Sequence, residues 1–523
     1  MKKSFIIISA LCLLTCSVSF AQNKKPLKQL QQEFVDLRFG MFIHYNIPTY
    51  MTDDWADPDA SPAIFNPTKL DCSQWAKTAK DANMTYGCLT TKHHSGFCIW
   101  DTKTTDYSVM NSPYKKDIVK EYADAFRKEG LKVMLYYSIL DTHHKIRPNQ
   151  ITPSHIDMIK AQLIELLTNY GEVTALIIDG WDAPWSRLSY DEIPFEDIYY
   201  LVKSIQPNCL VMDLNAAKYP AEALFYTDIK SYEQGAGQNI SKDRNKLPAL
   251  SCLPINSAWF WKQNFPTSPV KDPAKMVNDN IIPMNKVHCN FILNAAPNRD
   301  GLIDDNAVAA FKEIGKLWKN EGPLPSIPDN DAPIISSNLA KHKPSKASWG
   351  YDMAIMDLAN DDDFRTGWQS NPNVSELPRF EVELAANELP FNMIVLTQNN
   401  RNENRILKYR LEYFSNGVWK TLHEGSNTEK IIIHRFSRVY GNKVKIVVTE
   451  AFKEPSIAEF GVYNERGERG QMQMPLSGGG ELIFGDRFSK ESETISTTLP
   501  ILTKSGDTIS VKLPILLPVK DNN

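Results

Sequence analysis

Acidic, imidazole and phenol side chains that could act on a ligand stand at the ends of short apolar runs between residues 36 and 295. These side chains are His44, His93, His94, Tyr136, Asp179 and Glu233. Asp179 ends the run ALIIDG (175–180), and a carboxylate placed after buried apolar residues is costly unless it is paired or used. The spacing therefore favours a ligand-facing role for Asp179, with a helix N-cap in a loop as the alternative.

Hydrolysis of a glycosidic bond needs two carboxyl groups, a nucleophile or base and a proton donor. Glu233 is the preferred partner for Asp179, because it follows a strand-like run and precedes the polar loop QGAGQN. Asp228 lies within that run and Glu222 precedes it, so both remain weaker candidates. Trp181 stands two positions after Asp179, and an indole commonly forms a wall against the apolar face of a sugar.

The adjacent histidines His93 and His94, in LTTKHHSGFCIWDT (89–102), allow three interpretations. They could bind a metal, donate or accept hydrogen bonds with sugar hydroxyls, or pack in the core. Adjacent residues of a strand point to opposite faces, which argues against both reaching one ion. Neither an HxH nor an HExxH spacing is present, so hydroxyl recognition together with His44 is favoured and no metal is expected.

The elements that must position these residues alternate between apolar runs and amphipathic segments. The runs cover residues 37–45, 86–91, 132–138, 175–180, 209–215, 224–232, 250–255 and 288–294, and helices are expected over 117–130, 154–171 and 195–205. Eight strands alternating with helices over about 260 residues predict a (β/α)8 barrel. An open doubly wound sheet is the alternative, but no glycine-rich phosphate loop follows an early strand. Catalytic groups of a barrel lie at the carboxyl ends of its strands, which is where the candidates stand.

The sequence divides into four predicted parts. Residues 1–21 have Lys2 and Lys3, an apolar stretch and a small-residue end at Ala21, which is typical of a cleaved secretory signal. Residues 22–325 form the barrel, and the proline-rich linker PLPSIPDNDAP leads into alternating strands over 335–465 that predict an antiparallel β-sandwich. Residues 466–523 form a β-rich tail of unassigned role.

Composition restricts the class of partner and the compartment. The formal net charge is −4 and the pI about 6.2, so no basic field is available for nucleic acid. The signal predicts a secreted or periplasmic protein without a membrane span, and lipoprotein anchoring at Cys16 is the weaker alternative. The other six cysteines behind the signal are expected to be free thiols rather than a disulfide framework.

The barrel segment resembles glycoside hydrolase family 29, the retaining α-L-fucosidases. The resemblance rests on RFGMFIHYN, the histidine-pair stretch with FCIWDTKTT, ALIIDG and CNFILNAAPNRDGLI, in that order. It implies Asp179 as nucleophile and His44, His93, His94 and Tyr136 as sugar ligands. It also implies Asp54 and Trp55 as the counterpart of a Glu-Trp pair that touches the sugar, and supports Glu233 as acid/base. No cofactor is implied.

The sandwich segment resembles a discoidin-like (factor 5/8 C-domain) module, through SNLAKHKPSKAS, DDDFRTGW and RFEVELA. Such modules often bind sugars, so this part is a candidate for glycan contact. Asp361, Asp362 and Asp363 could hold calcium, or they could form a solvated acidic turn.

Together these features predict a secreted retaining exo-glycosidase that removes terminal α-L-fucosyl residues from a glycan. Asp179 and Glu233 would be its catalytic pair, and Trp55 and Trp181 would wall the pocket. The alternative is a catalytically inactive carbohydrate-binding protein on the same scaffold.

Overall fold

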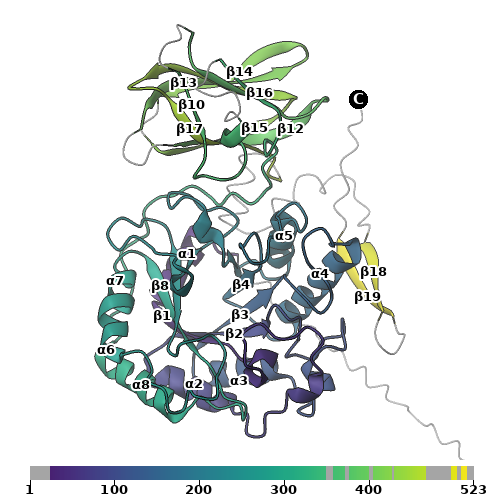
Figure 1. Ribbon diagram of the computed structural model, residues 1–523, viewed down its shortest axis with the longest axis vertical. Coiled ribbons are helices and arrows are strands. Elements are labelled where there is room, and N and C mark those ends of the chain that lie inside the picture. Colours follow the sequence, from purple (N-terminus) through teal and green to yellow (C-terminus); the bar gives the residue numbers. More distant parts are fainter. Residues whose placement is uncertain are drawn as a thin grey trace, which may run out of the picture.

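The computed structural model describes residues 24–348, 357–371, 376–399, 404–426 and 429–466, and the backbone of 496–502 and 508–514. The predicted signal at 1–21 and the anchor candidate Cys16 lie outside the described residues. Figure 1 shows two large bodies, with the helices of the first around its sheet and a β-sandwich beyond them.

The first body is an eight-stranded parallel sheet surrounded by helices. Its elements are α1 (Leu27–Asp36), β1 (Phe39–Ile43), α2 (Cys72–Asp81), β2 (Tyr86–Lys92), α3 (Ile118–Lys128), β3 (Lys132–Ser138), α4 (Pro153–Thr168), β4 (Ala175–Asp179), α5 (Phe195–Ile205), β5 (Leu210–Asp213), β6 (Lys230–Glu233), β7 (Ala249–Pro254), α6 (Pro273–Lys275), η6 (Met276–Ile281), α7 (Ile282–Asn285), β8 (Cys289–Ala295) and α8 (Asp305–Leu317). The strand order β5-β4-β3-β2-β1-β8-β7-β6 confirms the barrel.

The seam of this barrel lies between β5 and β6, which are not joined by a ladder of strand pairing. The Asp228 amide donates to Val211 O at 2.8 Å, and the Asp213 amide donates to the Thr227 hydroxyl at 3.2 Å. Asp228 also forms a buried ion pair with Lys203 at 2.8 Å. The weaker candidate Asp228 therefore holds the seam and does not reach the barrel mouth.

The strands are apolar on both faces because helices cover the outside of the barrel and side chains fill the inside. Every residue of β1, β2, β4, β5 and β8 is buried. Helix ends follow local chemistry. Gly130 and Gly171, beyond the ends of α3 and α4, have φ of +73° and +70°, as expected of glycine at these positions. The N-cap of α4 is Thr152, and Pro153 takes the first helical position.

Parallel register brings the strand ends together. Ser138 of β3 pairs with Asp179 of β4, and Glu233 of β6 pairs with Cys252 of β7. Lys92, the last residue of β2, pairs with Tyr137 of β3. The candidate residues therefore share one end of the barrel.

The second body is the predicted antiparallel sandwich (Figure 1). Its strands are β9 (Ser345–Ala347), β10 (Trp368–Gln369), β11 (Arg379–Glu383), β12 (Leu389–Gln398), β13 (Ile406–Ser415), β14 (Val418–Ser426), β15 (Ile431–Gly441), β16 (Lys443–Ala451) and β17 (Ser456–Tyr463). They form sheets of order β10-β17-β12-β15 and β14-β13-β16-β11-β9 around a core that includes Trp368, Phe380 and Phe460. In the tail, β18 (Ser496–Leu502) and β19 (Thr508–Pro514) pair antiparallel.

The acidic turn of the sandwich is paired within the protein. Asp361 accepts from the Thr366 hydroxyl, and Asp363 forms an ion pair with Arg365 at 2.6 Å. Asp362 accepts from the Asn338 amide at 2.8 Å. Across all described residues, no group of three or more His, Cys, Asp or Glu side chains has a geometry that could hold a metal ion. The three carboxylates of the turn are therefore engaged by other side chains of the sandwich.

All six cysteines of the described part of the chain are buried and free, as expected. In the same part, no helix has the length and apolar character needed to cross a bilayer.

Candidate active site

A cavity of about 280 Å³ opens at the carboxyl ends of the barrel strands. It is lined by Phe42, His44, Asp54, Trp55, His93, His94, Tyr136, Asp179, Trp185, Leu214, Glu233, Cys252, Trp259 and Phe260. All the predicted site residues except Trp181 belong to this lining. The two predicted catalytic carboxyl groups, on β4 and β6, therefore face one enclosed space.

Asp179 is fixed by two hydrogen bonds, one to each carboxylate oxygen. The Tyr136 hydroxyl donates to Oδ2 at 2.6 Å, and the Asn215 amide donates to Oδ1 at 3.0 Å. His94 Nε2 lies 3.7 Å from Oδ2. Because a donor contacts each oxygen, the two hydrogen bonds hold the Asp179 side chain in one orientation, as a nucleophile requires.

Asn215 is in turn positioned by Asp213 at the end of β5. The Asn215 backbone amide donates to Asp213 Oδ1 at 2.9 Å, and the Tyr190 hydroxyl donates to Asp213 Oδ2 at 2.5 Å. Burial is the main cause that raises the pKa of Asp213 to about 7. Tyr190 stacks on Tyr226, their centroids 3.8 Å apart, close to the link with the sandwich. The orientation of Asp179 thus depends on a network that extends through the β4–α5 loop.

Glu233 differs from Asp179 in its surroundings. Burial, and secondly the negative charge of Asp179, raise the pKa of Glu233 to about 7, while a hydrogen bond from Trp259 opposes them. The Trp259 indole donates to Glu233 Oε1 at 3.1 Å. The raised pKa of Glu233 suits a proton donor, and the fixed orientation of Asp179 suits a nucleophile.

His44 and His94 are neutral in this site. Burial lowers the pKa of His44 to about 3 and that of His94 to about 4. His44 Nδ1 lies 2.8 Å from Oδ1 of the Asn294 side chain, which can only accept, so Nδ1 carries the proton. His94 Nδ1 likewise donates to the Ser138 hydroxyl at 2.7 Å, because that hydroxyl donates to Leu140 O. Each ring therefore keeps Nε2 unprotonated as an acceptor for a ligand hydroxyl.

His93 and His94 share the cavity, contrary to the expectation that they point to opposite faces. β2 ends at Lys92, so strand alternation no longer applies, and the two ring centroids lie 3.9 Å apart. His93 Nδ1 is buried and has no hydrogen-bond partner among the described residues. A buried polar atom without a partner is costly, and a bound hydroxyl would satisfy it. Below the pair, Lys92 forms a fully buried ion pair with Asp141 at 3.3 Å.

Asp54 and Trp55 lie at the rim. The Asp54 carboxylate is held by Lys262, 2.6 Å from Oδ1, and accepts from the Trp259 backbone amide at 3.2 Å. Trp55 packs 4.7 Å from the His94 ring and is 44% exposed. Both residues therefore line the cavity.

Trp181 is the one predicted site residue that lies elsewhere, and its assignment as a pocket wall is wrong. Its side chain is fully buried, donates to Ile193 O at 2.8 Å and packs on Tyr190 and Phe195. Gly180, at φ +111°, turns the chain directly after Asp179, so the indole points into the barrel wall.

Comparisons with known proteins identify the family. The family model described as alpha-L-fucosidase matches residues 12–323. The chain belongs to the α-L-fucosidase family. It is therefore a glycoside hydrolase, and 28% identity over 471 residues relates it to α-L-fucosidase 1 of Arabidopsis thaliana, covering 84% of this chain and 87% of that one.

Two solved structures of α-L-fucosidases are also similar. Isoenzyme 1 from Paenibacillus thiaminolyticus has 22% identity and a TM-score of 0.48, covering 82% of this chain and 99% of that chain. A family 29 fucosidase from Ruminococcus gnavus, solved in complex with fucose, has 22% identity and a TM-score of 0.44, covering 85% and 95%.

Several residues that line this family member's cavity or support Asp179 were not assigned to the site from the sequence. Trp259 and Phe260 stand in SAWFWKQ (257–263), directly after the strand at 249–254, and this aromatic run past a strand end was a usable signal. Trp185 lies six residues beyond Asp179, in a stretch without a strand or helix pattern that would predict its place in the cavity. Asn215 ends a predicted run, but only the fold brings its amide to Asp179.

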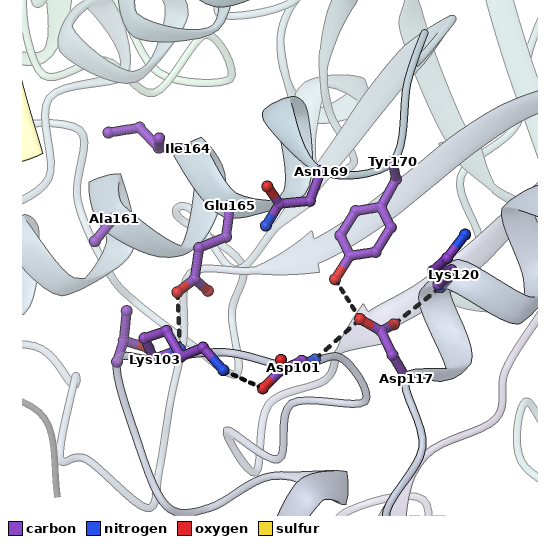
Figure 2. Close-up of a pocket in the computed structure, with 10 residues that line it drawn as sticks. Asp101, Lys103, Asp117, Lys120, Ala161, Ile164, Glu165, Asn169 and Tyr170 are labelled. Carbon is purple, nitrogen blue, oxygen red and sulfur yellow. Dashed lines mark hydrogen bonds and ion pairs between the residues drawn. The ribbon is translucent and has the colours of Figure 1, made fainter. Parts of the chain in front are cut away.

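A second, larger cavity of about 380 Å³ on the flank of this α-L-fucosidase-family barrel has different chemistry (Figure 2). It is lined by Asp101, Lys103, Thr104, Asp117, Lys120, Ala161, Ile164, Glu165, Asn169 and Tyr170. Its carboxylates are already used: Asp101 pairs with Lys103, Asp117 accepts from Tyr170, and Glu165 accepts from the Lys103 amide. The smaller cavity at the strand ends is therefore the candidate active site.

Proposed function

We propose that this protein is a retaining exo-α-L-fucosidase with Asp179 as nucleophile and Glu233 as acid/base. The observation that carries the proposal is the contrast between two carboxyl groups in one cavity. Tyr136 and Asn215 donate to the two Asp179 oxygens at 2.6 and 3.0 Å, whereas burial and the charge of Asp179 raise the pKa of Glu233 to about 7.

The reaction follows from these two states. An Asp179 oxygen attacks the anomeric carbon, the bond to the leaving oxygen breaks, and protonated Glu233 gives its proton to that oxygen. The fucosyl unit is then an ester of Asp179. The Glu233 carboxylate next takes a proton from water, the resulting hydroxide attacks the anomeric carbon, and Asp179 leaves as a carboxylate.

The choice of fucose is supported by the mixed lining of the cavity. Unprotonated Nε2 atoms of His44 and His94 can accept from ring hydroxyls, and buried His93 Nδ1 lacks a partner among the described residues. Phe42 and Leu214 add apolar surface. A 6-deoxy sugar places a methyl group against such a surface, where a 6-hydroxyl would lose hydrogen bonds to water.

Secretion and the role of the sandwich are also proposals. The charged start, apolar stretch and Ala21 support a signal that directs the chain to the periplasm or outside the cell. The discoidin-like pattern supports glycan contact by the second body. The test is N-terminal sequencing of the protein after export from the cell. A first residue other than residue 22 would contradict the signal assignment.

The test of the catalytic proposal is turnover of an aryl α-L-fucoside by the wild type and two variants. Asp179→Ala and Glu233→Ala are each expected to lower turnover by at least about 10³-fold. Azide is expected to restore turnover to Asp179→Gly, because it can enter the space left by the nucleophile. A wild type that binds fucose but hydrolyses no aryl glycoside would contradict the proposal.

A further inference from the structure

Two tryptophans at the cavity mouth leave much of their surface in solvent. Trp55 and Trp185 are each 44% exposed, whereas Asp179 and His94, deeper in the cavity, are each 5% exposed. The two indoles meet edge to face with centroids 5.3 Å apart, and both pack on the ring of His94 at 4.7 and 4.4 Å. They form an aromatic rim above the nucleophile. Trp185 is part of this rim, and the proposed reaction at Asp179 and Glu233 gives it no role.

The loop that carries Trp185 is fixed by hydrogen bonds at its base. The Asp182 amide donates to Leu188 O at 2.6 Å, and the Arg187 amide donates to Ala183 O at 2.8 Å. These two hydrogen bonds join residues before Trp185 to residues after it, and so fix the base of the loop. An aromatic ring presented by a preorganised backbone loses little conformational freedom when a ligand covers it.

The position of the nucleophile places the leaving group towards this rim. Asp179 is 5% exposed and lies deep in a cavity of about 280 Å³, whose lining also includes the half-exposed Trp55 and Trp185. A sugar ring seated over Asp179 fills the deep part of the cavity. The next unit of the substrate, joined through the oxygen that Glu233 protonates, then lies towards the mouth, where exposed apolar surface is available.

We propose that Trp185 is a specificity-determining platform that stacks against the pyranose ring to which the fucosyl unit is attached. The indole face is complementary to the C–H face of a pyranose. The enzyme therefore favours substrates whose leaving group is a sugar over those with a leaving group that carries no ring. This inference rests on the proposed fucosidase activity and adds the class of leaving group.

The test compares a leaving group with a ring and one without. The value of kcat/KM is measured for α-L-fucosyl fluoride and for the best-cleaved member of a panel of fucosyl disaccharides. Trp185→Ala is expected to lower the ratio of disaccharide to fluoride kcat/KM about tenfold, equivalent to about 1.4 kcal/mol of transition-state binding. Trp185→Phe, which keeps a flat apolar face, is expected to restore most of the ratio. Phe452→Ala, a change at a 63% exposed ring of the sandwich, is the matched control and should leave the ratio unchanged.

An unchanged ratio in Trp185→Ala would overturn the proposal, even if both rates fell together, because equal losses indicate a general structural effect. Failure of the wild type to hydrolyse the fluoride would instead contradict the proposed function. In that case the platform is tested by calorimetry of ligand binding to the wild type and to Trp185→Ala. The variant must weaken binding of the disaccharide more than binding of free fucose. Equal weakening of the two ligands would overturn the proposal.

Discussion

The hydrogen bond from Trp259 to Glu233 gives a direct way to move the pKa of the proposed acid. Its indole nitrogen donates to Glu233 Oε1 at 3.1 Å and lowers a pKa that burial and Asp179 have raised to about 7. Trp259→Phe keeps an aromatic ring against His44, whose ring centroid lies 4.9 Å from that of Trp259, and removes the indole donor. The pKa of Glu233 should therefore rise.

The size of the change follows from the strength of the bond. A hydrogen bond to a charged group contributes about 1.5–3 kcal/mol, and about 1.4 kcal/mol corresponds to one pKa unit. At the low end of that range, appropriate to a partly buried carboxylate, the pKa of Glu233 rises from about 7 to about 8. The acid is active when protonated, so wild-type kcat/KM falls as pH rises through about 7, and the variant should retain activity to about pH 8.

The assay is the pH profile of kcat/KM with a fucoside whose leaving group is weakly acidic, such as phenyl α-L-fucoside, because such a group needs protonation. The control is Trp261→Phe, since the Trp261 indole donates to Asp304 at 2.8 Å, outside the cavity lining. That control should leave the profile unchanged. A basic limb that stays in place in Trp259→Phe, or moves to lower pH, would refute the assignment of Glu233 as the acid.

Three further predictions follow from other contacts. Asn215→Ala removes the donor to Asp179 and should lower kcat/KM about 10- to 100-fold at equal expression and melting temperature; a loss below about threefold would contradict its positioning role. Lys92→Met leaves Asp141 buried without its cation, so urea denaturation should report a loss of about 3–5 kcal/mol in the free energy of unfolding; a loss below about 1 kcal/mol would show that the pair is dispensable. Exhaustive dialysis against EDTA should leave hydrolysis unchanged, and a loss reversed by added zinc or calcium would contradict a reaction that needs only side chains.

The barrel and most of its site could be predicted because two local signals agree. Apolar runs mark the strands, and parallel pairing then places whatever follows each run at one end of the sheet. Asp179, Glu233 and His44 follow such runs, so their meeting required no knowledge of side-chain packing.

The remainder depended on backbone turns and packing that leave no periodic signal. Trp181 was misplaced because the backbone at Gly180 has a φ of +111° directly after β4 and the indole is buried against Tyr190 and Phe195. His93 and His94 were separated in the prediction by a rule for strands, yet β2 ends one residue before them. Trp185 reaches the cavity only through a hydrogen-bonded loop, whose shape sequence patterns do not determine.

The central claim is that Asp179 forms a covalent bond to the sugar during turnover. A 2-deoxy-2-fluoro-fucosyl fluoride slows the second step and should trap this ester, so mass spectrometry of peptides from the inactivated enzyme measures it directly. The account predicts one added fluoro-deoxyfucosyl mass on the peptide containing Asp179 and none in Asp179→Asn. A label on another residue, or steady turnover that releases inverted sugar without any label, would contradict it.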